Sequence, residues 1–141
     1  MEKSLSEIAA ETVHNHAISE QAQKWVPAGT VLINKSGTTE RSPTCDNCKS
    51  WIRHWEVLSY EERPLRGDCA VYGCNGVTES GNAAQIFGCH VTIKGDEDQR
   101  EFIAPLCQCC NNKPVGTEMI LKKDVTLILA NVAKTCSKLI K

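Results

Sequence analysis

Cysteine is the residue type that most constrains how this chain can fold. The sequence of 141 residues contains nine cysteines, an odd number that fits a complete set of disulfide bonds badly. The N-terminal stretch MEKSLSEIAAETVHNH is charged and lacks the apolar segment of a secretory signal. We therefore expect a cytoplasmic, reducing setting, in which clustered cysteines bind metal more often than they pair with one another.

Four of the cysteines have the spacing of zinc ligands. Cys69 and Cys74 form one pair, and Cys107 and Cys110 form another. Two thiolates a few residues apart can reach one metal ion, and a second pair brought up by the fold completes the tetrahedron. Cys107 and Cys110 are expected at the start of a helix, where the positive end of the dipole favours thiolates. The sequence therefore predicts one structural Zn²⁺ site made of these four residues.

A second zinc site is predicted around the remaining pair, Cys45 and Cys48. Its third expected ligand is Cys136, and its fourth is His54 or Cys109. Other thiolate chemistry stays open at this point. An iron–sulfur cluster could use the same ligands, whereas a redox Cys-x-x-Cys motif needs a βαβ context that the surrounding pattern does not supply.

The predicted elements are those of an α+β protein in two regions. An amphipathic helix over residues 4–24, a strand over 30–34 and a polar loop make up an N-terminal region, residues 1–44. A cysteine-rich zinc-binding domain follows over residues 45–141.

Inside that domain a helix follows Cys48. Trp51, Trp55 and Leu58 recur on one helical stripe, which predicts a buried face rather than a platform for stacked bases. Strands are expected around FGCHVTI and REFIAPL, a short helix at CQCCNNK, and a last strand over residues 125–132.

The hairpin with Gly88-Cys89-His90-Val91 and the stretch IAPLCQCCN carry a family resemblance. Together with the preceding cysteine pair, they resemble the HNH-type treble-clef zinc finger. They are also similar to short bacterial and phage proteins with a G-x-H-V … I-x-P-L-C-x-x-C-N pattern. The resemblance covers residues 45–115. It implies a small zinc-stabilised treble-clef, HNH-like ββα core behind the N-terminal helix.

The same resemblance implies catalytic roles for two residues. His90 would be the general base that takes a proton from water, and Asn111 would bind a catalytic Mg²⁺ or Mn²⁺. This sequence departs from the family pattern twice, because Cys89 replaces a metal-binding aspartate and Phe102 replaces the asparagine that orients the histidine. The pattern favours an intact zinc fold with a damaged catalytic site.

Two functions are compatible with these observations. The first is a zinc-stabilised, non-catalytic binding module with a protein or nucleic-acid partner, in the manner of a small regulator or inhibitor of bacterial or phage origin. The alternative is a metal-dependent HNH-type endonuclease, which would need cations such as Lys94, Arg100 and Lys113 against the phosphates. The formal net charge of −1 gives no general attraction to nucleic acid. No membrane association is expected, and the sequence leaves the oligomeric state open.

Overall fold

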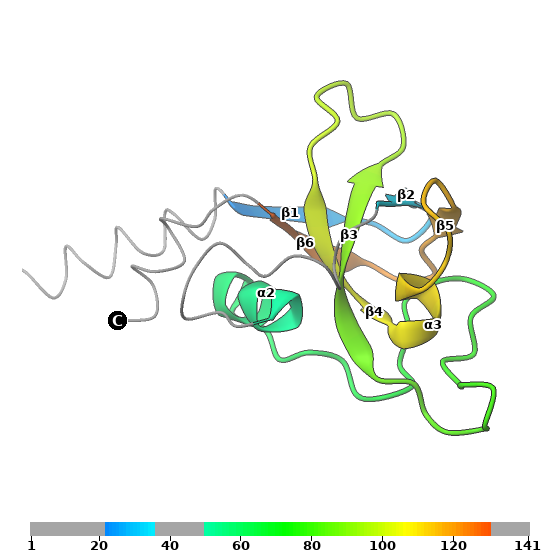
Figure 1. Ribbon diagram of the computed structural model, residues 1–141. Coiled ribbons are helices and arrows are strands. Elements are labelled where there is room, and N and C mark those ends of the chain that lie inside the picture. The colour runs from blue at the N-terminus through cyan, green and yellow to red at the C-terminus, as the bar shows by residue number, and fades with distance from the viewer. Residues whose placement is uncertain (1–21, 36–49, 131–141) are drawn as a thin grey trace, which may run out of the picture.

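The computed structural model describes residues 22–35 and 50–130. Their main feature is a six-stranded antiparallel sheet, with α2 packed against one face (Figure 1). The strands are β1 (Gln23–Val26), β2 (Val31–Asn34), β3 (Ile86–Ile93), β4 (Phe102–Cys107), β5 (Glu118–Ile120) and β6 (Val125–Leu129). The helices are α2 (Trp51–Ser59) and α3 (Gln108–Asn111).

The sheet has the order β1-β6-β4-β3-β2-β5 and curls into a half-barrel. Strands β3 and β4 form the central hairpin, in which His90 is paired with Ile103 and Ile86 with Cys107. Most residues of these two strands are buried, as expected for strands that are covered on both faces.

The prediction of an α+β protein with a treble-clef, HNH-like ββα core is wrong, because the described residues form mostly one antiparallel sheet with few helices. The predicted hairpin and the short helix after it are both present, but β3 also pairs with β2, and β4 also pairs with β6. The hairpin is therefore the middle of a larger sheet instead of a two-stranded ribbon folded over a helix. The predicted opening helix lies mostly outside the described residues, and its last two residues, Gln23 and Lys24, belong to strand β1.

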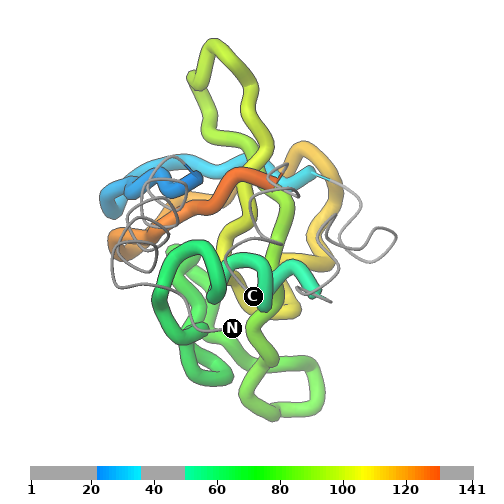
Figure 2. The backbone as a smooth tube through the Cα atoms, turned by 90° about the vertical axis from the view of Figure 1, so that its left-hand side faces the viewer, coloured from blue at the N-terminus to red at the C-terminus, as the bar shows by residue number. Residues whose placement is uncertain are grey.

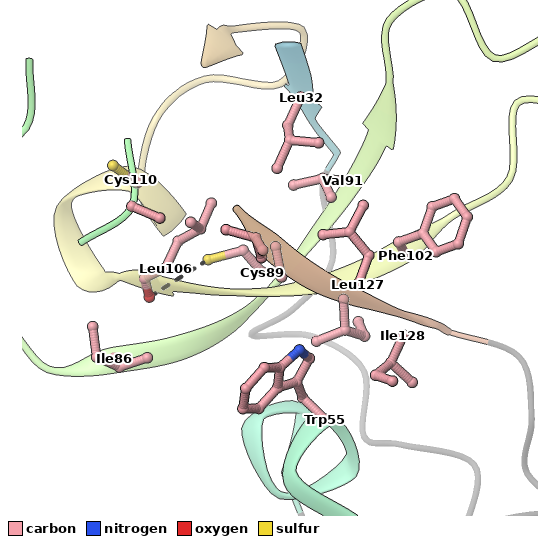
Figure 3. Close-up of a cluster of buried hydrophobic side chains, with 14 of the residues drawn as sticks. Leu32, Trp55, Ile86, Cys89, Val91, Phe102, Leu106, Cys110, Leu127 and Ile128 are labelled. Atoms are coloured by element: carbon pink, nitrogen blue, oxygen red, sulfur yellow. Dashed lines mark hydrogen bonds between the residues drawn. The ribbon is translucent and has the colours of Figure 1, made fainter. Parts of the chain in front are cut away.

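Side chains from several strands and from α2 form one buried hydrophobic core (Figure 3). Leu32, Val91, Leu127 and Met119 are among its fully buried members, and they come from four different strands. The predicted division at residues 44 and 45 stays a prediction, although β1 and β2 lie in the same sheet as the strands of the second region.

Helix α2 confirms the predicted helix after Cys48. The Ser50 hydroxyl accepts a hydrogen bond from the Arg53 N–H at 3.2 Å and caps its start. Tyr60, with φ of 59°, ends it in the left-handed conformation. Trp51 and Trp55 are buried, which confirms their prediction as core residues.

Gly88 allows α2 to lie close to the sheet. A Cβ atom at this position would lie 2.4 Å from the backbone carbon of Trp51 and 2.6 Å from the nitrogen of Ile52. No side chain fits there unless the helix moves, so the glycine determines how closely helix and sheet approach each other.

Candidate metal centre

Four thiols from two distant parts of the chain meet at one point. The sulfur atoms of Cys69, Cys74, Cys107 and Cys110 all lie within 4.8 Å of one another. The Sγ–Sγ distance is 3.6 Å for Cys69 and Cys110 and 3.4 Å for Cys74 and Cys107. A tetrahedral zinc site with Zn–S bonds of about 2.3 Å separates its sulfurs by about 3.8 Å. The predicted grouping of these four cysteines is therefore confirmed, with a spacing close to that of a metal site.

The geometry differs from that of disulfide bonds. Bonded sulfurs lie about 2.0 Å apart, and all six described cysteines are free thiols. Three members of the group, Cys69, Cys107 and Cys110, are at most 1% exposed. Four free thiols packed this closely, most of them out of contact with water, form an arrangement suited to a soft or borderline cation.

The first pair lies in the irregular segment between α2 and β3. A β-turn brings Cys74 back toward Cys69, with the Cys74 N–H donating to the Val71 carbonyl at 3.1 Å and Gly73 at φ of 82°. Val71 forms a β-bridge with Leu121, which directly follows strand β5, and this bridge attaches the segment to the end of the sheet. The sequence indicated the turn, but it gave no sign of this bridge.

The second pair lies where strand β4 passes into α3. Cys107 is the N-cap of the helix and Cys110 is buried within it, so the predicted helix start at Cys107 is confirmed. The Gln108 N–H donates to the Gln85 carbonyl at 2.8 Å, which fixes the start of the helix beside strand β3. Figure 1 shows α3 at the end of β4, next to the long segment that carries the first pair.

The thiols affect one another's ionisation. The Cys110 thiol donates to the Cys69 sulfur and, with backbone N–H groups of Cys107 and Val71, lowers the pKa of Cys69 to about 4. The same contact raises the pKa of Cys110 above its usual value. Burial raises the pKa of Cys107 to about 12. A bound metal ion would favour the thiolate form of all its ligands.

Two other described cysteines are not members of this group. Cys89 is buried on β3, and burial raises the pKa of its thiol. Its sulfur lies 3.9 Å from the Leu106 carbonyl oxygen (Figure 3). Cys109 is partly exposed on α3 and directs its thiol to the Val77 carbonyl at 3.5 Å. Cys109 therefore differs from its neighbour Cys110 in its surroundings, in agreement with the prediction that Cys110 belongs to the four-cysteine group and Cys109 does not.

The structure tests the predicted second zinc site only in part. Cys45, Cys48 and Cys136 lie outside the described residues, so this site stays a prediction. His54 is described and fully buried on α2, with its Nε2 atom 3.1 Å from the Leu129 carbonyl oxygen. Its Nδ1 atom has no hydrogen-bond partner among the described residues. Burial lowers the pKa of His54, which favours the neutral ring.

His90 lies on β3 beneath helix α2. Its side chain is 1% exposed, its ring meets that of Trp51 edge-on at 4.3 Å, and its Nδ1 atom lies 3.4 Å from Glu101 Oε1. Because Ile103 is its partner on β4, it is four residues, or roughly 13 Å, away from Cys107 along the strand. It is therefore not a ligand of the four-cysteine group.

The catalytic roles of His90 and Asn111 stay predictions. A general base must reach both the water and the substrate, and the burial of His90 counts against such a role. Asn111 is the last residue of α3 and directly follows Cys110, so it lies at the cysteine end of the hairpin.

No family model, curated protein or solved structure matches this chain. The resemblance to HNH-type proteins accordingly rests on its motif alone and stays a prediction. Within the described residues, no helix combines the length and the apolar character needed to cross a membrane. The four-cysteine group is the observation that bears most directly on function.

Proposed function

We propose that this protein is a non-catalytic binding module whose fold is stabilised by one zinc ion on Cys69, Cys74, Cys107 and Cys110. The observation that carries the proposal is the convergence of four sulfurs within 4.8 Å of one another. Zinc sites with four cysteine ligands are closed structural sites, because no coordination position remains for water or substrate.

A structural role agrees with the position of the site in the chain. Residues 60–85, between α2 and β3, contain no named helix or strand, and so long an irregular segment is uncommon inside a compact domain. Its buried residues Cys69, Ala70 and Val71 are mostly small and contribute little apolar area. A metal ion shared with Cys107 and Cys110 would attach this segment to β4 and α3, and its binding energy would become folding energy.

The charges around the β3–β4 hairpin support a protein partner over a nucleic acid. Two of the cations expected to contact phosphates are already paired with carboxylates. Lys94 Nζ lies 3.0 Å from Glu118 Oε1, and Arg100 Nε lies 3.3 Å from Asp96 Oδ2. A surface that binds a nucleic acid needs unpaired lysine or arginine side chains, which take the place of the counterions around the phosphates.

Metal analysis of protein purified without chelators tests the zinc site. We expect Cys110→Ser to lose one equivalent of zinc relative to the wild type, and the adjacent Cys109→Ser to lose none. Co²⁺ substitution should give the visible absorption of tetrahedral thiolate coordination in the wild type and lose that component in Cys110→Ser. Retention of the full zinc content by Cys110→Ser would overturn the proposal, as would iron and sulfide in the isolated protein.

A further inference from the structure

A groove opens on the α2 side of the sheet, and its lining includes Asp68 and Ala70, the two neighbours of Cys69 in the chain. Its volume is about 380 Å³, which is at the small end of the range for ligand pockets and suits one or two side chains better than a large cofactor. Strands β1, β4 and β6, helix α2 and the segment after it all contribute to its lining. Figure 2 shows the same elements from the side. Its apolar walls include Trp25, Trp55, Pro64 and Pro105.

Trp25 is the most unusual part of this lining. It is 61% exposed, although a large aromatic side chain usually gains stability by burial. It is paired with Thr126 across β1 and β6, and paired residues of an antiparallel ladder lie on the same face of the sheet. The Trp55 indole N–H donates to the Thr126 carbonyl at 2.8 Å. This bond holds the buried Trp55 against β6, whereas Trp25 remains accessible.

The charged residues of the groove are mostly acidic. They are Glu61, Glu62, Asp68, Asp124 and Lys123. The ammonium group of Lys123 lies 2.8 Å from Asp68 Oδ1, and Asp124 Oδ1 accepts the Ala28 N–H at 2.9 Å. The carboxylates of Glu61 and Glu62 have no ion pair with any described residue. Because the whole chain has a net charge of only −1, the negative charge at this groove is a local feature.

We propose that this groove binds an arginine or lysine side chain presented by an extended basic segment of a partner protein. The proposal rests on the proposed function as a binding module and specifies the chemistry of its partner. A guanidinium or ammonium group over the face of Trp25 gains a cation–π interaction, and the carboxylates at the rim complement its charge. Arginine fits best, because its planar group stacks on an aromatic ring and donates to a carboxylate at the same time. Phosphate groups would be repelled here, so a nucleic acid is the wrong partner for this surface.

The three tryptophans of the chain provide a direct assay, since each indole N–H gives its own ¹⁵N NMR signal. Zinc-loaded protein is titrated at low salt with a short acetylated, amidated peptide that contains two arginines. We expect the signals of Trp25 and Trp55 to move, because both side chains line the groove. The signal of Trp51 should stay, because Trp51 does not line the groove and packs beside His90 instead. The same peptide with glutamate in place of arginine should move none of them.

Matched variants separate a specific groove from general charge attraction. Trp25→Ala should weaken the arginine peptide roughly tenfold, whereas Tyr72→Ala, which removes another exposed aromatic ring, should not change its affinity. The double change Glu61→Gln and Glu62→Gln should weaken it roughly threefold to tenfold. The matched double change Glu79→Gln and Glu97→Gln, at exposed acids outside the groove, should leave it unchanged.

Three results would overturn the inference. The first is a Trp25 signal that does not move at millimolar arginine peptide. The second is an equal loss of peptide affinity in the groove variants and in the control variants. The third is binding of the glutamate peptide or of single-stranded DNA that is tighter than binding of the arginine peptide. Zinc content and the folded NMR spectrum are measured on the same samples. A failure of the groove in zinc-loaded, folded protein therefore leaves the zinc site intact, and a failure of the zinc site is visible before any peptide is added.

Discussion

Removal of the proposed zinc ion should cost this protein several kcal/mol of stability, and the loop that the ion would close sets the amount. The ion would link Cys74 to Cys107, which are 33 positions apart in the chain. Closing a loop of that length in the unfolded chain costs about 4 kcal/mol of conformational entropy in the chain-entropy treatment of cross-links. A small domain has a total stability of about 5 to 15 kcal/mol, so this single linkage is a large part of the whole.

Urea unfolding measures the loss. With a slope of about 2 kcal/mol per molar urea for a small domain, a loss of about 4 kcal/mol lowers the midpoint by about 2 M. We expect this shift when a strong chelator removes the zinc, and a comparable shift in Cys74→Ser without chelator. Cys109→Ser is the matched control, because it removes the same atom from a neighbouring cysteine outside the group, and its midpoint should stay close to that of the wild type.

The reasoning is refuted if chelation removes one equivalent of zinc and the urea midpoint does not move. It is also refuted if Cys109→Ser and Cys74→Ser lower the midpoint equally, since the stabilisation would then not depend on membership of the four-sulfur group.

Four further outcomes follow from individual contacts. Gly88→Ala should lower the free energy of unfolding by roughly 2 to 3 kcal/mol, because the new methyl group meets the backbone of α2. The control Gly81→Ala, with open space but φ of 85°, should cost about 1 kcal/mol, and equal losses would show that contact with α2 is not the cause. Trp55→Phe leaves the partly buried Thr126 carbonyl of strand β6 without its indole donor and should cost about 1 kcal/mol in the same assay. Burial lowers the pKa of His54, so below about pH 6.5 the unfolded chain takes up a proton on this ring that the folded protein does not. The free energy of unfolding should therefore fall as the pH falls below about 6.5. A ¹⁵N titration of the folded protein in which the His54 ring is half protonated at pH 6.5 or above would contradict this. Because His90 is buried, folded, zinc-loaded protein should cleave neither plasmid nor RNA with Mg²⁺ or Mn²⁺, and cleavage that disappears in His90→Ala would reverse that conclusion.

The sequence was informative wherever the determinants are local. The two cysteine pairs are spaced by single turns, so their ability to share a metal ion could be read from the spacing alone. Helix α2 could also be predicted from the sequence, because Trp51, Trp55 and Leu58 repeat at the helical period. All three are buried in the structure. The hairpin and the helix start at Cys107 also follow from short-range patterns.

The arrangement of the sheet depends on pairings that the local pattern does not contain. Strand β1 pairs with β6 from the other end of the chain, with Gln23 opposite Ile128, and nothing in QKWV or VTLIL specifies that partner. Strands β1 and β5 have only four and three residues, too few for a recognisable alternation. A hairpin followed by a helix with two cysteines is common to a treble clef and to this sheet. The motif could therefore predict the cysteine group correctly and the surrounding fold wrongly.

The zinc site and the groove share one segment of chain, and this relates the two proposals physically. Cys69 lies between Asp68 and Ala70, which both line the groove, and Lys122 N–H donates to the Ala70 carbonyl at 2.8 Å. A metal ion that holds Cys69 therefore also holds the neighbouring part of the groove lining, Asp68 and Ala70, in place. Binding at either site orders the same residues, so each should strengthen the other by the same factor. Arginine-peptide affinity should consequently fall when zinc is removed under conditions in which the protein stays folded. An unchanged affinity in folded, zinc-free protein would show that the groove is held by the sheet and α2 alone.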